Sequence, residues 1–165
     1  MKKIIAAALL PIMLLCSCNA KSTKPDTMPE SYKTDVLISD NGREFSGSFC
    51  KDEKGWEYEF SAPESIKGMK LSKTAEGFTA ELEKLKITDA PEKLPQNSPA
   101  RLIAGALEMC ESGKGVTAEY KGGKVVNKGV INGADFEVTF DDGIPCSMEI
   151  GGEIAVTFKN FASND

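Results

Sequence analysis

Side chains that could perform acid–base or nucleophilic chemistry are few in this sequence. It contains no histidine, which removes the usual general base, the Ser-His and Cys-His nucleophile pairs and the commonest metal ligand. Two candidates are left, the carboxylate pair Asp141-Asp142 and the hydroxyl of Ser98. The pair precedes Gly143 in a pattern typical of a turn, and Ser98 precedes Pro99 as a helix N-cap does. We therefore predict no catalytic residue, no enzyme activity and no cofactor.

Cysteines are the other residues with chemistry of their own. No two of the five are spaced as a C-x-x-C pair, so the sequence predicts no metal site. Beyond the first twenty residues only Cys50, Cys110 and Cys146 occur, and they allow at most one disulfide within the chain, whose pairing stays open. Cys110 falls on an apolar helical face and Cys146 on an apolar strand face. Both are predicted to be small buried hydrophobic residues.

Cys18 has a different chemistry because of the residues that precede it. Two lysines begin the chain after Met1, and an apolar run follows over residues 4–15. The run is too short to span a bilayer and is typical of a signal peptide. Residues 15–18, Leu-Cys-Ser-Cys, resemble the bacterial lipobox, in which the last cysteine becomes lipidated. Cleavage before Cys18 leaves the small Ser17 at the cut. The alternatives are an ordinary secretory signal that is cut near Ala20 and a buried apolar segment.

The lipobox divides the chain into segments. Residues 1–17 are predicted to be the signal peptide, and Cys18 to carry the lipid, palmitate among its acyl chains. Residues 18–30 are polar and irregular, as in a flexible tether. One β-rich domain is predicted over residues 31–161, followed by a tail at 162–165. We expect a protein of the cell envelope that faces outward from the cytoplasm, on the outer leaflet of the cytoplasmic membrane or, in a two-membrane cell, on the outer membrane.

Charge excludes some partners. The chain has 20 basic and 25 acidic residues, a net charge of −5. Nucleic acid favours a basic patch on its partner, so we predict no nucleic-acid binding. The same balance argues against broad adhesion to anionic lipid headgroups. The membrane partner is therefore expected to be held through the lipid anchor.

Most of the chain beyond residue 31 alternates apolar and polar residues, which predicts strands. The clearest example is Trp56, Tyr58 and Phe60, which alternate with Glu57 and Glu59. Turn signals separate the alternating segments, which lie at 32–39, 45–49, 56–60, 66–72, 78–82, 116–120, 124–131, 134–140, 144–150 and 154–158.

Two segments differ from this pattern. Leu82, Leu85 and Ile87 continue a strand only if a bulge lies near residues 83–84, with a helical turn as the alternative. Pro99–Ser112 has apolar residues at helical spacing, with Gly113 as its stop, and predicts one amphipathic helix that docks on a sheet.

These elements predict a mainly β fold of the α+β kind. It is expected to be a curved antiparallel sheet, or half-open barrel, of about nine to ten strands with one amphipathic helix. A sheet with one apolar face must cover that face. One helix cannot cover nine strands, so the sheet is expected to curl strongly.

The lipobox, the meander of amphipathic strands and the aromatic segment at residues 56–64 together resemble the lipoprotein carrier and receptor proteins of the LolA/LolB type. Gly143-Ile144-Pro145 before a strand, and the closing segment 154–161, are compatible with that family. The resemblance implies an unclosed curved sheet whose apolar concave face binds acyl chains. The chain departs from the family in having one lid helix instead of several. Neither Arg43 nor Arg101 lies on an apolar strand face, where the family has a cavity arginine.

Two functions are therefore left open. The first is a membrane-anchored binding module that takes an acyl chain or another hydrophobic ligand in its curved sheet. Its lining is expected to be Phe49, Trp56, Tyr58, Phe60, Met69, Leu71 and Phe78. The second is a structural or protein-interaction lipoprotein with an envelope protein as partner, in which these seven residues form a closed core.

Overall fold

A computed structural model describes residues 24–89 and 97–163, and within these ranges eleven strands form one antiparallel sheet. The order across the sheet is β6-β5-β4-β3-β2-β1-β11-β10-β9-β8-β7. The mainly β class predicted from the alternation is confirmed. The strands are β1 (Tyr32–Asp40), β2 (Arg43–Asp52), β3 (Gly55–Ala62), β4 (Lys70–Thr74), β5 (Gly77–Leu82), β6 (Leu85–Asp89), β7 (Thr117–Lys121), β8 (Lys124–Ile131), β9 (Ala134–Asp141), β10 (Ile144–Ile150) and β11 (Ile154–Ser163).

Tight turns explain why neighbours in sequence are neighbours in the sheet. Asn41-Gly42 and Asn132-Gly133 both have positive φ at each residue, 49° and 79° in the first turn and 50° and 83° in the second. That backbone matches the right-handed twist of the flanking strands, and Asn and Gly adopt it at low cost. Each turn therefore returns the chain antiparallel to the strand that it has just left.

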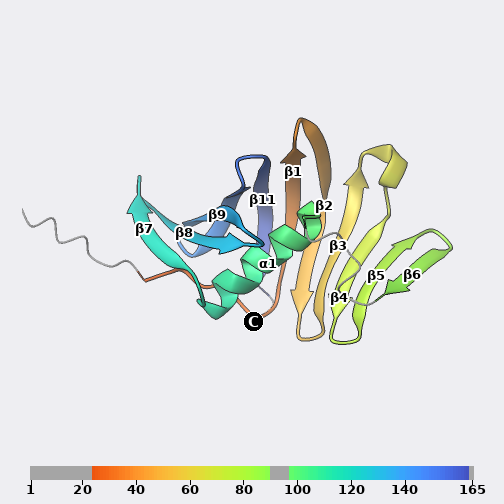
Figure 1. Ribbon diagram of the computed structural model, residues 1–165, viewed down its shortest axis with the longest axis horizontal. Coiled ribbons are helices and arrows are strands. Elements are labelled where there is room, and N and C mark those ends of the chain that lie inside the picture. The colour runs from red at the N-terminus through yellow and green to blue at the C-terminus, as the bar shows by residue number, and fades with distance from the viewer. Residues whose placement is uncertain (1–23, 90–96, 164–165) are drawn as a thin grey trace, which may run out of the picture.

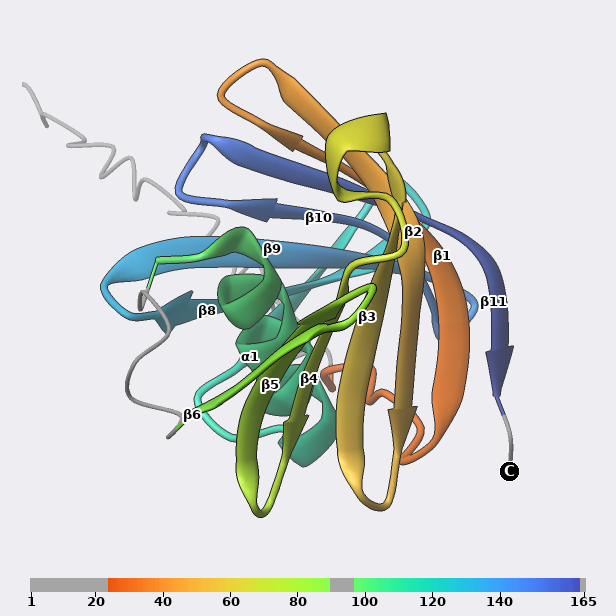
Figure 2. The same ribbon diagram turned by 90° about the vertical axis from the view of Figure 1, so that its right-hand side faces the viewer.

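Two such meanders, β1–β6 and β7–β11, meet where β1 pairs with β11. Val36 lies opposite Phe158 and Ile38 opposite Val156 in this central pair. The sheet curves so that helix α1 (Pro99–Ser112) lies inside its concave side (Figure 1). Seen from the end, the strands of the two meanders run at a steep angle to each other around the helix (Figure 2). The predicted curling is therefore present, and the two edges, β6 and β7, do not pair.

The core fills the space between α1 and the concave face. Buried side chains from β1, β9, β10 and β11 face the helix; they include Val36, Phe136, Val138, Phe140, Met148, Ile150 and Val156, all at most 4% exposed. From the helix come Leu102, Ile103, Ala104, Ala106, Leu107 and Cys110. The apolar stripe predicted on the helix is thus buried against the sheet.

The ends of α1 follow the sequence signals with one difference. Gly113 stops the helix with φ of 65°, a left-handed conformation that glycine adopts without strain. Ser98 occupies the N-cap with an extended backbone, but its side chain makes no capping hydrogen bond. The N–H of Arg101, which a capping hydroxyl would bind, donates instead to the Ser98 carbonyl at 3.0 Å.

Two predicted boundaries are wrong around β4 and β6. The bulge expected near residues 83–84 is a two-residue hairpin turn, with Leu82 opposite Leu85 and Glu83 at φ of 53°. The turn lacks glycine, which is why the sequence did not reveal it, and it raises the strand count above nine to ten. The strand expected at 66–72 starts later, at Lys70, because a 3₁₀ turn over Glu64–Ile66 and Gly68 at φ of 78° come first.

Strand β10 also departs from the predicted alternation. Its pairing with β9 shifts between Pro145 and Ser147, so that Pro145, and not Ile144, lies opposite the buried Phe140. Ile144 is 49% exposed as a result. The buried position predicted for Cys146 is wrong for the same reason: it is half-buried and its Sγ lies 3.3 Å from the Thr139 carbonyl oxygen. Cys110 is fully buried as predicted.

The signal peptide, its cleavage site and the lipid attachment at Cys18 lie outside the described residues. At the C-terminal end β11 continues through Ser163, two residues into the predicted tail. At the N-terminal end Met28 is 4% exposed and belongs to the core, although the sequence predicts a tether through residue 30. Its long apolar side chain fills space in the core and so helps to dock an otherwise polar segment.

Candidate hydrophobic-ligand site

Register places six of the seven predicted lining residues on one face of the sheet, and Met69, which precedes β4, packs against the same core. Phe49 lies opposite Tyr58, which lies opposite Leu71, and Trp56 and Phe78 flank Lys73 in the next row. Aromatic rings connect them: Phe49 and Trp56 stack at 5.9 Å between centroids, and Tyr58 and Phe60 meet edge to face at 4.5 Å. All seven belong to the hydrophobic core or pack against it.

Burial divides these residues into two groups. Phe49, Trp56, Tyr58, Phe60 and Phe78 are between 2% and 9% exposed and form part of the core. Met69 and Leu71 are half-buried at its margin. The structure thus brings the predicted residues together, and most of them fill space between the sheet and the helix.

Helix α1 is held on the concave face by close packing on one side. Gly105 faces β8 so closely that an added Cβ would lie 2.3 Å from the Ile131 Cδ1 atom. A side chain at this position would force either the helix or Ile131 to move. Glycine here lets the helix approach the β8–β9 turn.

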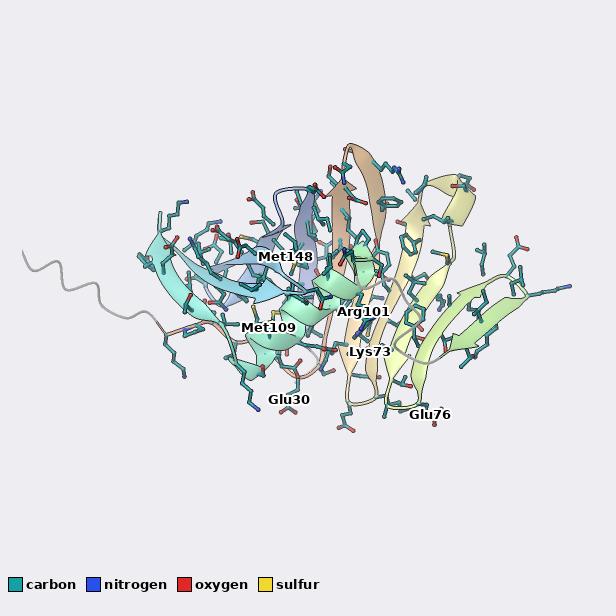
Figure 3. The ribbon with its side chains drawn as sticks, viewed as in Figure 1. Glu30, Lys73, Glu76, Arg101, Met109 and Met148 are labelled. Carbon is teal, nitrogen blue, oxygen red and sulfur yellow. The ribbon has the colours of Figure 1, made fainter. Side chains whose placement is uncertain are left out.

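Ion pairs hold the other side of the helix. Glu111 binds Lys51 of β2 at 2.9 Å, and Glu108 binds Lys73 of β4 at 3.1 Å. The first pair is the more buried, with side chains 15% and 24% exposed against 43% and 38% for the second. The two glutamates are three residues apart and so share one side of the helix. Figure 3 shows Lys73 and Arg101 next to one another near the N-terminal half of α1.

A cavity of about 160 Å³ lies between this part of the helix and the sheet. Its floor contains Trp56 and Phe78, and its rim contains Lys73, Arg101 and Glu108. Ligand pockets usually enclose about 300–1,000 Å³. The cavity alone therefore has room for only part of an acyl chain or of a similar ligand.

Next to the cavity the sheet has an apolar surface that α1 does not cover. Leu71 of β4, Ala80 of β5 and Ile87 of β6 lie opposite one another across three strands, and Leu82 lies opposite Leu85 in the adjoining row. We call these five residues the apolar strip. Leu85 is 70% exposed and Ile87 is 62% exposed. Phe78, two residues before Ala80 on the same face of β5, joins the strip to the cavity.

Two polar atoms are buried within the aromatic part of the site. Trp56 Nε1 and the Tyr58 hydroxyl have no hydrogen-bond partner among the described residues. Burial disfavours the charged form of a phenol and raises the pKa of Tyr58 above its ordinary value. Tyr58 is therefore a neutral, permanently protonated part of the apolar lining.

Within 24–89 and 97–163 no three histidine, cysteine, aspartate or glutamate side chains are grouped so that they could hold a metal ion. Asp141 and Asp142 occupy the β9–β10 turn, where Asp142 has φ of 50° and Asp141 pairs with Lys124 at 2.9 Å. Cys50, Cys110 and Cys146 are free thiols. Among the described helices, none combines the length and apolar character needed to cross a membrane.

Sequence reasoning missed several residues of this site. Lys73, Arg101 and Glu108 are ordinary charged residues in the sequence, and only the position of α1 on the sheet brings them to the cavity. Leu85 and Ile87 carried a usable signal, because an apolar pair alternating with lysine and threonine predicts an amphipathic strand. Their place at the sheet edge depends on the hairpin turn at residues 83–84.

This arrangement defines a curved, unclosed antiparallel sheet with a helix in its concave side. A solved structure of an uncharacterised conserved protein from Thermus thermophilus is similar, with a TM-score of 0.50 and 12% identity over 84% of this chain and 81% of that one. A LolA superfamily protein from Nitrosomonas europaea gives a TM-score of 0.46 and 8% identity over 86% of this chain and 90% of that one.

The first similarity extends to the fold alone, and the second is too distant to bear on function. No protein-family model and no curated protein sequence matches the chain.

Proposed function

We propose that this protein is a non-catalytic lipoprotein of the bacterial cell envelope that binds an acyl chain on the concave face of its sheet. The ligand lies along the apolar strip, with one end in the cavity beside α1. Acyl chains on Cys18 hold the protein at the membrane. Two or three such chains anchor a protein far more firmly than one.

The exposed strip is the observation that carries this proposal. Leu85 and Ile87 are 70% and 62% exposed on the concave face of a strand whose other face carries Lys86 and Thr88. Exposed apolar surface of this kind marks an interaction site when it is contiguous. Here it is contiguous with Leu71, Ala80 and Leu82, and through Phe78 with the cavity.

An acyl chain matches the chemistry of this surface. It is linear and apolar and needs no hydrogen bonds, and the five residues of the strip have only hydrocarbon side chains. Burying such a chain is favourable by roughly 0.8 kcal/mol for each methylene group removed from water. Because the cavity holds only about 160 Å³, most of that gain has to come from the strip.

A second function has one observation in its favour. Phe49, Trp56 and Tyr58 are only 2% to 3% exposed, so the central part of the concave face is a packed core without room for a ligand. If the core stays closed, the strip is a docking surface for an envelope protein. The experiment below separates the two cases.

The test compares two substitutions on the same edge strand. Ile87→Glu places a charge on the strip, whereas Thr88→Glu places it on the opposite face and serves as the matched control. We expect native mass spectrometry of gently extracted protein to show a retained acyl ligand in the parent chain and in the control. Ile87→Glu is expected to lose that ligand and to weaken the binding of added fatty acid at least tenfold.

Two outcomes would contradict acyl binding. One is a parent protein that carries no ligand and whose melting temperature does not rise with added fatty acid. The other is equal loss of binding in both variants. The anchor is tested separately: Cys18→Ala is expected to abolish lipidation and membrane partitioning, and a processed, lipidated Cys18→Ala protein would contradict the assignment.

A further inference from the structure

The segment that connects the proposed anchor to the sheet is fastened to the domain before β1 begins. We call residues 24–31 the strap. Met28 of the strap is 4% exposed within the core, and the Asn127 side-chain amide of β8 donates a hydrogen bond of 2.7 Å to the Asp26 carbonyl. Asn127 is fully buried and lies opposite Ala118 of β7. The chain therefore becomes part of the fold at Asp26, beside the β7 edge.

This attachment shortens the tether. From Cys18 to Asp26 there are eight residues, which span at most about 27 Å when extended and about 16 Å on average when flexible. A compact domain of this size is roughly 35–40 Å across. The anchor therefore cannot bring every face of the domain to the bilayer with equal ease.

Opposite edges of the sheet differ in their distance from the strap. β7 and β6 are the two ends of the strand order, and Figure 1 shows them at opposite ends of the long axis of the molecule. The described chain begins beside β7, and Glu30 of the strap lies below the C-terminal part of α1 (Figure 3). The edge that contains β6 and the apolar strip therefore lies far from the point where the strap begins.

We propose that the β7 edge rests on the phospholipid surface and that the β6 edge points away from it. The inference relies on the lipid anchor of the proposed function. Side chains at the β7 edge suit phosphate-bearing headgroups: Lys24, Lys114 and Lys121 are exposed, and Tyr120 is 67% exposed. The exposed carboxylate of Glu119 on β7 is paired with Lys128 at 2.8 Å, and Glu30 of the strap is a further exposed acidic group. A lysine near an anionic membrane surface is attracted to it. A tyrosine is suited to the same interface because it has an apolar ring and a polar tip.

This orientation determines where the proposed ligand can enter and leave the protein. With β6 remote from the anchoring bilayer, the apolar strip opens toward the surroundings and not toward the lipids that hold the protein. Ligand would then be passed to or received from a second protein or membrane. The strap thus determines that the apolar strip, at the β6 edge, is available to a second protein or membrane.

Tryptophan quenching by brominated phospholipids can measure this orientation. The full chain is exported, lipidated and reconstituted into vesicles of phosphatidylcholine and phosphatidylglycerol. Tyr120→Trp reports from the β7 edge, and Lys86→Trp reports from β6 on the face away from the apolar strip, so that a bound brominated chain cannot quench it. Trp56, the one tryptophan of the chain, is replaced by phenylalanine in both variants, because it lines the cavity and a bound brominated chain could quench it.

We expect at least threefold more quenching of Tyr120→Trp than of Lys86→Trp. Inserting ten glycine and serine residues after Ala20 lengthens the tether without changing any described residue, and is expected to reduce the difference to less than twofold. Equal quenching in the parent chain, or stronger quenching of Lys86→Trp, would overturn the proposed orientation. So would a difference that survives the insertion unchanged, because the tether would then not set it.

The mass of the same preparation tests the lipid anchor at Cys18 separately from the orientation of the domain. A chain without lipid at Cys18 would overturn the proposed anchor and the orientation together. A lipidated chain with equal quenching would overturn the orientation and leave the anchor intact. Near-ultraviolet circular dichroism of each variant verifies that the fold is unchanged.

Discussion

Two regions of the concave face have the same kind of strand but different surroundings. One region is the covered side, which packs against α1, and the other is the uncovered side, at the β6 edge. On the side that α1 covers, Phe136, Val138 and Phe140 of β9 are at most 1% exposed. On the other side, Leu85 and Ile87 of β6 alternate with polar residues in the same way and are 70% and 62% exposed. The difference arises from the helix, which lies over one side and ends before the other.

This contrast separates the part of the apolar face that is packed in the core from the part that stays exposed to solvent. Side chains packed against α1 remove apolar area from water on folding, at about 25 cal/mol for each Å². Leu85 and Ile87, the exposed members of the apolar strip, remove little, so they add little to the stability of the fold. Substitutions on the two sides should therefore affect different measurements.

The largest expected effect is on the covered side. Phe140→Ala empties a fully buried position and is expected to lower the free energy of unfolding by about 3–5 kcal/mol. Ile87→Ala, on the uncovered side, should change it by no more than about 0.5 kcal/mol. Urea denaturation followed by circular dichroism measures both. Equal losses would show that the strip is part of the stabilising core.

A smaller effect on the covered side is the loss of stability that we expect at high pH. Burial raises the pKa of the Cys110 thiol from 9.0 to about 11. The unfolded chain therefore releases this proton first, and stability that is complete below pH 9 is lost as the pH rises toward 11. The loss amounts to about 1.4 kcal/mol for each pH unit in this window.

The matched variant for this effect is Cys110→Ala, measured by urea denaturation at pH 8, 9 and 10. Tyr32 and Tyr58, whose pKa values are also raised by burial, keep their contribution in both proteins. The variant should show the shallower decline. An identical decline in the two proteins would mean that Cys110 titrates alike in the folded and unfolded chains.

The smallest effect concerns the two ion pairs that join α1 to strands β2 and β4. Glu111→Gln breaks the more buried ion pair with Lys51 and is expected to cost about 1 kcal/mol, and Glu108→Gln should cost about half as much. Both losses should shrink at high salt. Denaturation at low and high ionic strength measures them. A larger loss in Glu108→Gln would mean that burial does not determine the strength of these pairs.

Local signals predicted most of this fold. The helix bounds Pro99–Ser112 agree with the structure, and the Asn-Gly turns are where the sequence placed them. Each depends on a few adjacent residues, because caps and I′ turns need particular side chains at particular positions. The hairpin at residues 83–84 and the shift in β10 were missed because Glu83 and Cys146 have no such local preference.

The site was harder to predict for a related reason. Alternation identified Phe49, Trp56, Tyr58, Phe60 and Phe78 as one apolar face, and register brings them together. Alternation could not say which part of that face the helix would cover. That outcome depends on long-range contacts such as Gly105 with Ile131 and Glu111 with Lys51.

The pairing of the first strand with the last has a consequence for synthesis. β1 is complete at Asp40, but one of its two neighbours, β11, begins only at Ile154. While the chain is being made, the backbone of β1 that will face β11 has no strand to bind. An open edge of this kind is prone to pair with other chains. The most central pair of the finished sheet is thus the last to become available, and the nascent chain needs protection until β11 has emerged.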